Sequence, residues 1–371
     1  MLKIDSCLIV RNEESNIKKL LTQLLAFSSN IYVVDTGSTD STIEIIKSMG
    51  DERIHIDHFD WRKDFSAARN YSLSLSEDSD YIFWCDGDET LKDEFIDRLV
   101  EFTKEDDGDD AYAYGMTTKG ENEDESDCIV YWRVGMFKRS LGIEFGGAVH
   151  ECPCISDSQV NFERFAGLML VNRYDKTGAE VYRNLDIYVN VHNEKKSLTT
   201  RECFYTGKEF YDLGMYAPAA LFFTESIYVD PWYTEAIDAL SWWLYCVKQC
   251  ECIRHFKTSV RDIVDRMLGV GMLSRPVLLA YASYLYDAQD YEYAVKCAEK
   301  AMMMSDDGYS QILAQHQWNA VECLFVLVLS CYQLGSIEKA DHWNSMILDI
   351  DPENGSALHN REFFKTLKRE S

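Results

Sequence analysis

The chain has 371 residues, enough for two or three domains with sizeable hydrophobic cores. Its formal net charge of −26 argues against nucleic-acid binding, because an acidic surface repels phosphates, and it permits a basic protein or peptide partner. The chain has twelve cysteines, no basic and apolar leader, and no apolar run long enough to span a bilayer; together these predict a cytoplasmic protein with reduced thiols.

Segments typical of strands and helices alternate from the first residues. Apolar runs at Ile4–Val10 and Ile31–Val34 predict strands, and a short strand is expected around Ile54–Ile56. The first intervening helix has Ser15 as its candidate N-cap and one apolar face formed by Ile17, Leu20, Leu21, Leu24 and Leu25. The second helix carries Ile43, Ile45 and Ile46. This alternation predicts a parallel, doubly wound sheet, whose ligands bind beyond the carboxyl ends of the strands.

A further strand, starting at Tyr81, ends in two aspartates, Asp86 and Asp88, with Gly87 between them. Side chains alternate along a strand, but glycine lets the chain bend where the strand ends. Both carboxylates can then reach one divalent cation that bridges a diphosphate. An ordinary acidic turn is the alternative interpretation.

Three polar segments follow strands of the predicted sheet: Arg11–Glu14, Asp35–Asp40 and Asp86–Glu89. Because the carboxyl ends of parallel strands lie along one edge, these segments are expected to meet there, which makes that edge a candidate binding site. Asp35 could accept hydrogen bonds from a base or a ribose. For Thr36, Gly37, Ser38 and Thr39, a plain turn and helix cap is an equally good interpretation.

The segment Asp64–Asn70 predicts a helix with Asp64 as its cap. Arg69 on this helix is a candidate ligand for a diphosphate or a carboxylate, because a guanidinium group binds either through two parallel hydrogen bonds. A surface salt bridge is the alternative role for Arg69.

Four motifs, in this order, resemble the successive signatures of family 2 glycosyltransferases: Cys7–Glu14, Val33–Thr42, Asp64–Asn70 and Asp86–Glu89. The resemblance covers about residues 1–190. It implies the GT-A nucleotide-sugar fold, an α/β domain with a doubly wound mixed sheet. It also implies inverting, metal-dependent transfer from a uridine-diphosphate (UDP) sugar. The residues that the resemblance places against the nucleotide sugar are Asn12, Glu14, Asp35, Arg69, Asp86 and Gly87.

The same resemblance implies a metal site and a general base. Asp86 and Asp88 would form the Asp-x-Asp motif that holds Mg²⁺ or Mn²⁺. The segment Phe145–Glu151 lies where the family has a glycine pair followed by an acidic residue. An inverting transfer is a single displacement in which the acceptor loses a proton as it attacks, so Glu151 is the expected general base. His150 is expected to bind the metal or the diphosphate, with a buried structural histidine as the alternative.

One departure from the family pattern follows. Relatives with this Val-His-Glu ending often carry a His-x-Gly-Tyr-like segment further along the chain, and here the matching residues are Val171–Tyr174. A further histidine ligand for the metal is therefore missing at that place.

The pattern becomes all-helical in the second half. Gly214 precedes Asp230 by 16 residues, Gly335 precedes Asp351 by 16, and the two units lie 121 residues apart. Three intervals of about 40 residues fit helical hairpins of the tetratricopeptide (TPR) type. Two further copies are expected, one at Tyr281–Ala298 and a degenerate one at Trp242–Arg266. The expected domains are residues 1–190, a GT-A glycosyltransferase, and residues 191–371, an all-α TPR-like repeat.

A family 2 domain followed by such repeats resembles the sublancin-type peptide S-glycosyltransferases. The expected function is transfer of a hexose, such as glucose from UDP-glucose, to a Cys or Ser side chain of a peptide such as a bacteriocin precursor, which the repeats partly bind. Transfer to a cell-envelope glycan or lipid is the first alternative, and a non-catalytic scaffold with an inactive transferase domain is the second. The repeats could also form a homodimer. A nucleotidyltransferase is disfavoured, because Arg11–Glu14 stands where its Gly-rich loop would be.

Overall fold

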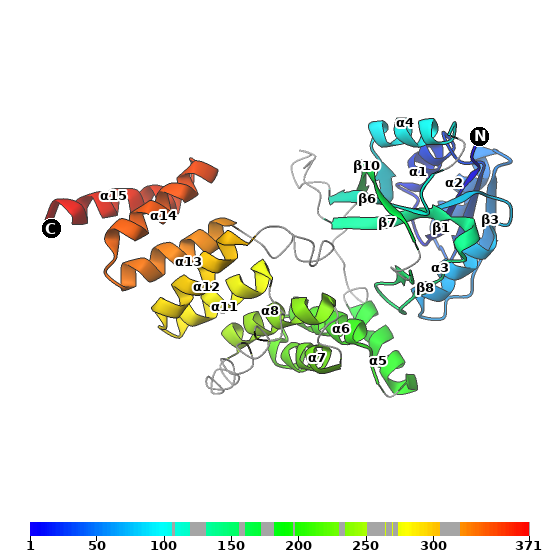
Figure 1. The fold of residues 1–371 in the computed structure, drawn as a ribbon. Helices are drawn as coiled ribbons and strands as arrows, with labels where there is room; N and C mark the ends of the chain where they lie inside the picture. Colours follow the sequence, from blue (N-terminus) through cyan, green and yellow to red (C-terminus); the bar gives the residue numbers. More distant parts are fainter. Residues whose placement is uncertain are drawn as a thin grey trace. The chain divides into compact units, whose positions relative to one another are not determined.

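The computed structural model describes most of the chain. The described residues are 1–105, 108–118, 131–155, 160–171, 182–195, 197–229, 234–250, 264, 269, 274–304 and 320–370. They divide into two compact units, Met1–Glu194 and Lys195–Ser371 (Figure 1). The domain boundary expected between residues 190 and 191 falls inside helix α5 (Arg183–Lys195).

An eight-stranded mixed sheet forms the centre of the first unit. Its strands are β1 (Ile4–Val10), β2 (Asn30–Asp35), β3 (Ile54–His58), β4 (Tyr81–Asp86), β5 (Glu89–Leu91), β6 (Ala111–Thr118), β7 (Tyr131–Lys138) and β10 (Phe162–Val171). They lie in the order β3-β2-β1-β4-β7-β6-β10-β5. The first four are parallel, β7 is antiparallel to both β4 and β6, and β5 is antiparallel to β10. The strand–helix alternation thus predicted the parallel part, and the mixed sheet implied by the family resemblance is confirmed.

Helices cover both faces of this sheet. They are α1 (Ile17–Leu24), α2 (Thr42–Met49), α3 (Phe65–Ser74) and α4 (Asp93–Phe102). Successive side chains of β1 point to opposite faces. Leu8 therefore packs in one hydrophobic cluster with Leu20 of α1 and Leu99 of α4, whereas Cys7 packs in another with Leu73 of α3. The doubly wound arrangement follows directly from this alternation.

The carboxyl ends of three parallel strands lie next to one another. Val10 of β1 is in register with Asp35 of β2, and Ile9 of β1 is in register with Asp86 of β4. The loops that leave these strands therefore begin at one edge of the sheet, as the sequence predicted.

Two predicted helix caps have different outcomes. Asp64 caps α3, and its Oδ1 accepts a hydrogen bond from the backbone N of Ala67 at 3.0 Å. Ser15 is not the cap of α1, because the chain first makes a turn in which the backbone N of Asn16 donates to Glu13 O. Helix α1 begins after Asn16, whose side chain forms no cap and makes contacts elsewhere.

The second unit consists of packed helical hairpins. The helices are α6 (Thr200–Asp212), α7 (Tyr216–Val229), α8 (Thr234–Gln249), α11 (Arg275–Asp287), α12 (Tyr291–Met303), α13 (Ala320–Gln333), α14 (Ile337–Ile350) and α15 (Gly355–Glu370). The turns of three hairpins each contain one residue in the left-handed region, Gly214 at φ 71°, Gln289 at φ 64° and Gly335 at φ 73°. This recurrence confirms the three complete repeats. The degenerate copy at Trp242–Arg266 begins in α8 but lies largely outside the described residues, as do Asp230 and Pro231.

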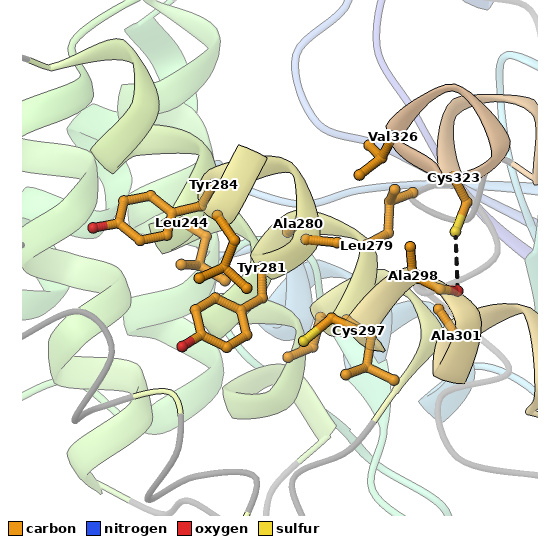
Figure 2. Packing of buried hydrophobic residues seen from close by; sticks show 14 of the residues in the cluster. Leu244, Leu279, Ala280, Tyr281, Tyr284, Cys297, Ala298, Ala301, Cys323 and Val326 are labelled. Carbon is orange, nitrogen blue, oxygen red and sulfur yellow. Dashed lines mark hydrogen bonds between the residues drawn. The ribbon is translucent and has the colours of Figure 1, made fainter. Parts of the chain in front are cut away.

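A continuous hydrophobic cluster joins these hairpins. Figure 2 shows its middle, which includes Leu279 of α11, Cys297 of α12 and Cys323 of α13. The Cys323 thiol donates to the carbonyl oxygen of Ala298 at 3.5 Å (Figure 2). Small side chains such as Ala298 and Ala301 are fully buried and let the helices approach closely. Among the described helices, none is long and apolar enough to cross a membrane.

Candidate active site

The loops after β1 and β2 are tied together at the carboxyl edge of the sheet. Asn12 Oδ1 accepts a hydrogen bond from Thr39 N at 2.7 Å, and Glu14 Oε2 accepts one from Ser41 N at 3.0 Å. In return, Glu14 N donates to Asp40 Oδ2 at 3.1 Å. Both residues expected near the nucleotide are exposed, and their side chains hold the shape of this edge.

Asp35 ends β2 and is largely buried. Its Oδ1 accepts a hydrogen bond from Ser38 N at 2.9 Å, and its Oδ2 lies 3.6 Å from His58 Nδ1. The carboxylate therefore shapes its own loop, as the turn interpretation requires, while it lies at the edge where the family resemblance expects a base or ribose.

The Asp-x-Asp turn joins β4 to β5 and is held by a side chain of α1's N-terminal turn. Asn16 Nδ2 donates to Gly87 O at 2.8 Å and to Glu89 O at 3.0 Å. A Cβ atom on Gly87 would lie 2.8 Å from Glu13 Cγ. Gly87 is therefore required for close approach of the loop after β1, whereas the sequence suggested it for bending of the strand.

Arg69 of α3 connects the Asp-x-Asp motif to the expected base. Its guanidinium group donates through Nη2 to Asp86 Oδ1 and, at 2.8 Å, to Glu151 Oε1. It also donates through Nη1 to Cys85 O at 3.2 Å, and its Cζ lies 4.4 Å from the ring centroid of Trp84. Arg69 is 1% exposed, so the surface salt bridge considered from the sequence is wrong.

Sequence reasoning assigned no role to Arg133, which lies on β7. Its Nη1 and Nη2 donate to Glu89 Oε1 and Oε2 at 2.6 and 2.7 Å, and Nη1 lies 3.6 Å from Asp86 Oδ2. Its Cζ lies 4.2 Å from the Trp84 ring centroid. Pairing of β4 with β7 brings these groups together, and no local sequence pattern predicts that pairing.

Glu151, Arg69, Asp86, Arg133 and Glu89 thus form a run of alternating charge, which we name the ion-pair chain. Burial by itself raises the pKa of Asp86, but the guanidinium groups of Arg69 and Arg133 outweigh it and lower that pKa below its usual value. Burial raises the pKa of Glu89, and Arg133 opposes this only in part. The ion-pair chain therefore keeps Asp86 ionised and directs both of its oxygens to arginine.

Asp88 has a different environment. Burial, together with the negative charges of Asp86, Glu89 and Glu13, raises the pKa of its carboxyl to about 8. Burial likewise raises the pKa of Glu13 to about 7, with contributions from Asp86 and Asp40. Crowded carboxyl groups of this kind fit a divalent cation, whose charge would compensate them.

Within the residues that the structure describes, no group of three His, Cys, Asp or Glu side chains is arranged to hold a metal ion. Mg²⁺ is commonly held by one or two carboxylates together with substrate phosphates and water. Asp88 fits that mode of binding. Asp86, which the family resemblance also assigned to the metal, has its two oxygens directed at Arg69 and Arg133.

His150 and Glu151 lie on a loop whose backbone is fixed from two sides. Phe65 N donates to Ala148 O at 2.9 Å, and the Tyr188 hydroxyl donates to Val149 O at 3.3 Å. His150 is exposed with φ 52°, so the alternative of a buried histidine is wrong. The Glu151 side chain is 11% exposed and faces Arg69. Asn172, Arg173 and Tyr174, where the family's further histidine is missing, lie outside the described residues.

Comparison with known proteins identifies the first unit. Residues 6–156 match the model of the family described as glycosyl transferase family 2. The chain is 30% identical over 152 residues to a TPR repeat-containing protein of Synechococcus elongatus, covering 41% of this chain and 35% of that protein. It is 28% identical over 214 residues to the SPbeta prophage-derived glycosyltransferase SunS of Bacillus subtilis, covering 55% of this chain and 48% of SunS. The chain thus spans half or less of the length of these relatives.

Among solved structures, S. aureus TarS 1–349 in complex with UDP is similar at 14% identity and a TM-score of 0.37, covering 82% of this chain and 93% of that one. The family match covers the strand, the loops and the helix that carry Asn12, Arg69, Asp86 and Glu151. Residues 6–156 therefore match glycosyl transferase family 2, and helical hairpins of the TPR type follow this domain in the chain.

Proposed function

We propose that the protein is an inverting glycosyltransferase that moves a hexose from a UDP-sugar to a side chain of a peptide. The ion-pair chain carries this proposal, because it brings a candidate base, Glu151, to the Asp-x-Asp motif through a single buried guanidinium group. The family 2 match supports the reaction class, and the similarity to SunS together with the TPR-type hairpins supports a peptide acceptor.

Each side chain at the carboxyl edge has a role in this proposal. Asn12, Glu14 and Asp35 line the part that receives the nucleotide, and Arg69 and Gly87 lie against the diphosphate side. Asp88 would hold Mg²⁺ or Mn²⁺ together with the donor diphosphate, and the exposed His150 would supply a further ligand to the metal or the diphosphate. A cation bound there supplies charge stabilisation to the departing diphosphate.

The proposed transfer is one displacement at the anomeric carbon of the sugar. The Glu151 carboxylate takes the proton of the acceptor thiol or hydroxyl as the sulfur or oxygen forms its bond to that carbon. The bond from the carbon to the diphosphate oxygen breaks at the same time, and its electron pair leaves with UDP. Arg69 holds Glu151 Oε1 at 2.8 Å and so orients the base.

We assign the acceptor to a peptide with a Cys or Ser side chain, such as a bacteriocin precursor, and the donor to UDP-glucose. The helical hairpins would bind part of this peptide, and the net charge of −26 favours a basic one. A thiol acceptor needs less help from the base, because a thiol is far more acidic than an alcohol. We also propose that the protein is cytoplasmic and that its helical hairpins can form a homodimer.

Mass spectrometry tests the proposal. The protein is incubated with MgCl₂ or MnCl₂ and one UDP-sugar at a time, together with Cys- or Ser-containing peptides or with envelope lipids and glycans. We expect a peptide to gain one hexose on Cys or Ser. Hexose found only on a lipid or glycan would replace the peptide acceptor by the envelope alternative, and no transfer or donor hydrolysis with any pair would contradict catalysis.

The role of Glu151 predicts a separation of binding from transfer. Glu151→Gln should bind UDP with wild-type affinity and lower the transfer rate by about 10²- to 10⁴-fold, the usual range for loss of a general base. Calorimetric titration with UDP and a rate assay measure the two effects. Glu144→Gln is the matched control, because Glu144 is exposed and directly precedes the segment Phe145–Glu151. This variant should keep the wild-type UDP affinity and the wild-type transfer rate. A collapse of UDP affinity in Glu151→Gln would make Glu151 a binding residue.

A further inference from the structure

We propose that Arg133 is a positioning residue of the donor site, which acts through Asp86 and Glu89. This inference rests on the proposed function, because it assigns Arg133 to the binding of a nucleoside diphosphate. Strand β7 pairs with β4 from the Tyr81–Lys138 pair to the Phe83–Met136 pair. The Arg133 side chain, further along β7, lies within reach of Asp86 and Glu89. Arg133 thus reaches the Asp-x-Asp turn from a strand that is distant in sequence.

Three interactions close a ring around the start of the turn. Arg133 donates to both oxygens of Glu89, at 2.6 and 2.7 Å. Glu89 Oε2 also accepts from Asp86 N at 2.9 Å, and Asp86 Oδ2 lies 3.6 Å from Arg133 Nη1. The backbone and the side chain of Asp86 are therefore both connected to one guanidinium–carboxylate pair.

The guanidinium group of Arg133 is itself held in place. Its Cζ lies 4.2 Å from the ring centroid of Trp84, and its Nη2 lies 3.4 Å from the Tyr114 hydroxyl. Trp84 Nε1 in turn donates to the carbonyl oxygen of Val134 at 2.9 Å. The neighbouring backbone of β7 thus fixes the ring on which Arg133 lies, and the Arg133 side chain is only 11% exposed. Arginine suits this place because a planar fork binds a carboxylate through two bonds, which lysine cannot do.

Arg133 and Arg69 divide the work at Asp86. Arg69 binds Oδ1 and Arg133 faces Oδ2, so the two cations fix the rotation of the Asp86 carboxylate from two sides. Without Arg133 the carboxylate keeps its bond to Arg69 but loses the second restraint. We expect donor affinity to fall, because the carboxylate next to the diphosphate is no longer held in one orientation.

The experiment must separate positioning from folding. Arg133→Met alone leaves the Glu89 carboxylate buried without its cation, which destabilises a protein whatever the arginine does for the ligand. The double variant Arg133→Met with Glu89→Gln removes both charges and avoids that penalty. Arg98→Met is the matched control, because Arg98 lies on the surface of α4 with partners at 3.9 and 3.8 Å, Glu101 and Glu105.

Two measurements are made on wild type, the double variant, Arg133→Lys and Arg98→Met: calorimetric titration with UDP in MgCl₂, and thermal unfolding without ligand. We expect the double variant to unfold within a few degrees of wild type and to bind UDP at least 10-fold more weakly. Arg133→Lys should weaken UDP binding at least 3-fold, and Arg98→Met should change neither quantity. With a sugar donor, the donor KM should rise in the double variant while the acceptor KM stays at its wild-type value.

A double variant that folds and binds UDP with wild-type affinity would overturn the proposal and make Arg133 and Glu89 a structural pair. If the double variant does not fold, Arg133→Lys decides, because wild-type UDP affinity in that variant overturns the proposal and a 3-fold loss supports it. Equal rises in donor and acceptor KM would also contradict a role specific to the donor. Failure of the proposed function is distinct, since wild type would then bind neither UDP nor another nucleoside diphosphate.

Discussion

Gly87 lies between the two aspartates of the Asp-x-Asp turn and touches the loop that follows β1. A Cβ atom built there would be 2.8 Å from Glu13 Cγ and 3.1 Å from Val10 Cγ1. Val10 is buried in a central strand and cannot move far, so any side chain at Gly87 must displace Glu13 or the turn itself. The Asp-x-Asp motif therefore needs glycine because of its neighbours.

This contact predicts the effect of one added methyl group. Gly87→Ala should lower the free energy of unfolding by about 1–3 kcal/mol, the usual cost of overpacking, and should weaken UDP binding because the carboxylates on either side shift. Urea unfolding and calorimetric titration measure the two effects. Wild-type values for both would show that the turn tolerates a side chain.

At the scale of elements, a second glycine decides how two helices pack. Gly207 of α6 faces Phe223 of α7, and a Cβ there would lie 2.7 Å from Phe223 Cε1 and 2.8 Å from Cδ1. The Phe223 ring is fully buried, with Phe204 at 5.9 Å and Trp242 at 6.5 Å between ring centroids. The ring has no room to retreat, so this glycine sets the approach of α6 to α7.

Two opposing effects then decide the outcome of Gly207→Ala. Alanine favours a helix over glycine by about 1 kcal/mol. Overpacking costs about 1–3 kcal/mol, and we expect it to win because the facing ring is enclosed. The variant should unfold at lower urea concentration than wild type. Gly355→Ala at the start of α15 is the matched control, because a Cβ atom built there would meet no neighbouring side chain or loop within 4 Å. Its free energy of unfolding should not fall below the wild-type value. If Gly207→Ala unfolds at a higher urea concentration than wild type, α6 and α7 can move apart at little cost in free energy.

At the scale of the whole molecule, the two units have separate hydrophobic clusters. Among the residues that the structure describes, the cluster of the hairpins runs from Phe204 to Phe364, and those of the transferase domain contain none of its residues. Stability of the hairpins and ligand binding by the transferase domain should therefore respond to different substitutions.

Leu279→Ala tests this separation. Leu279 is fully buried in α11 (Figure 2), and its truncation should lower the stability of the helical unit by about 2–5 kcal/mol. UDP affinity, measured below the unfolding transition, should stay at its wild-type value. Leu221→Ala on α7, where the side chain is 69% exposed, is the control and should change stability by no more than about 0.5 kcal/mol. Weaker UDP binding in Leu279→Ala would show that the two units are coupled.

Local patterns in the sequence predicted much of the fold. Apolar periodicity located β1, β2, α1 and the hairpins, since burial on one face repeats at the period of each element. The cap at Asp64 was correct for the same local reason, whereas Ser15 was displaced by a turn that the local pattern does not reveal. The partners of Arg133, Glu89 and Asn16 could not be predicted, because each contact joins segments brought together only by strand pairing.

The amino-acid sequence by itself determined that β1 to β4 alternate with α1 to α3, that the ends of β1, β2 and β4 carry polar loops, and that the second half repeats. Those properties depend on residues that are close in sequence. Only the tertiary structure decided that Asp86 faces two arginines, that Arg69 reaches Glu151, and that Gly87 lies against Glu13. Such contacts join residues far apart in the chain, and they depend on the order and direction in which strands pair, which no single segment encodes.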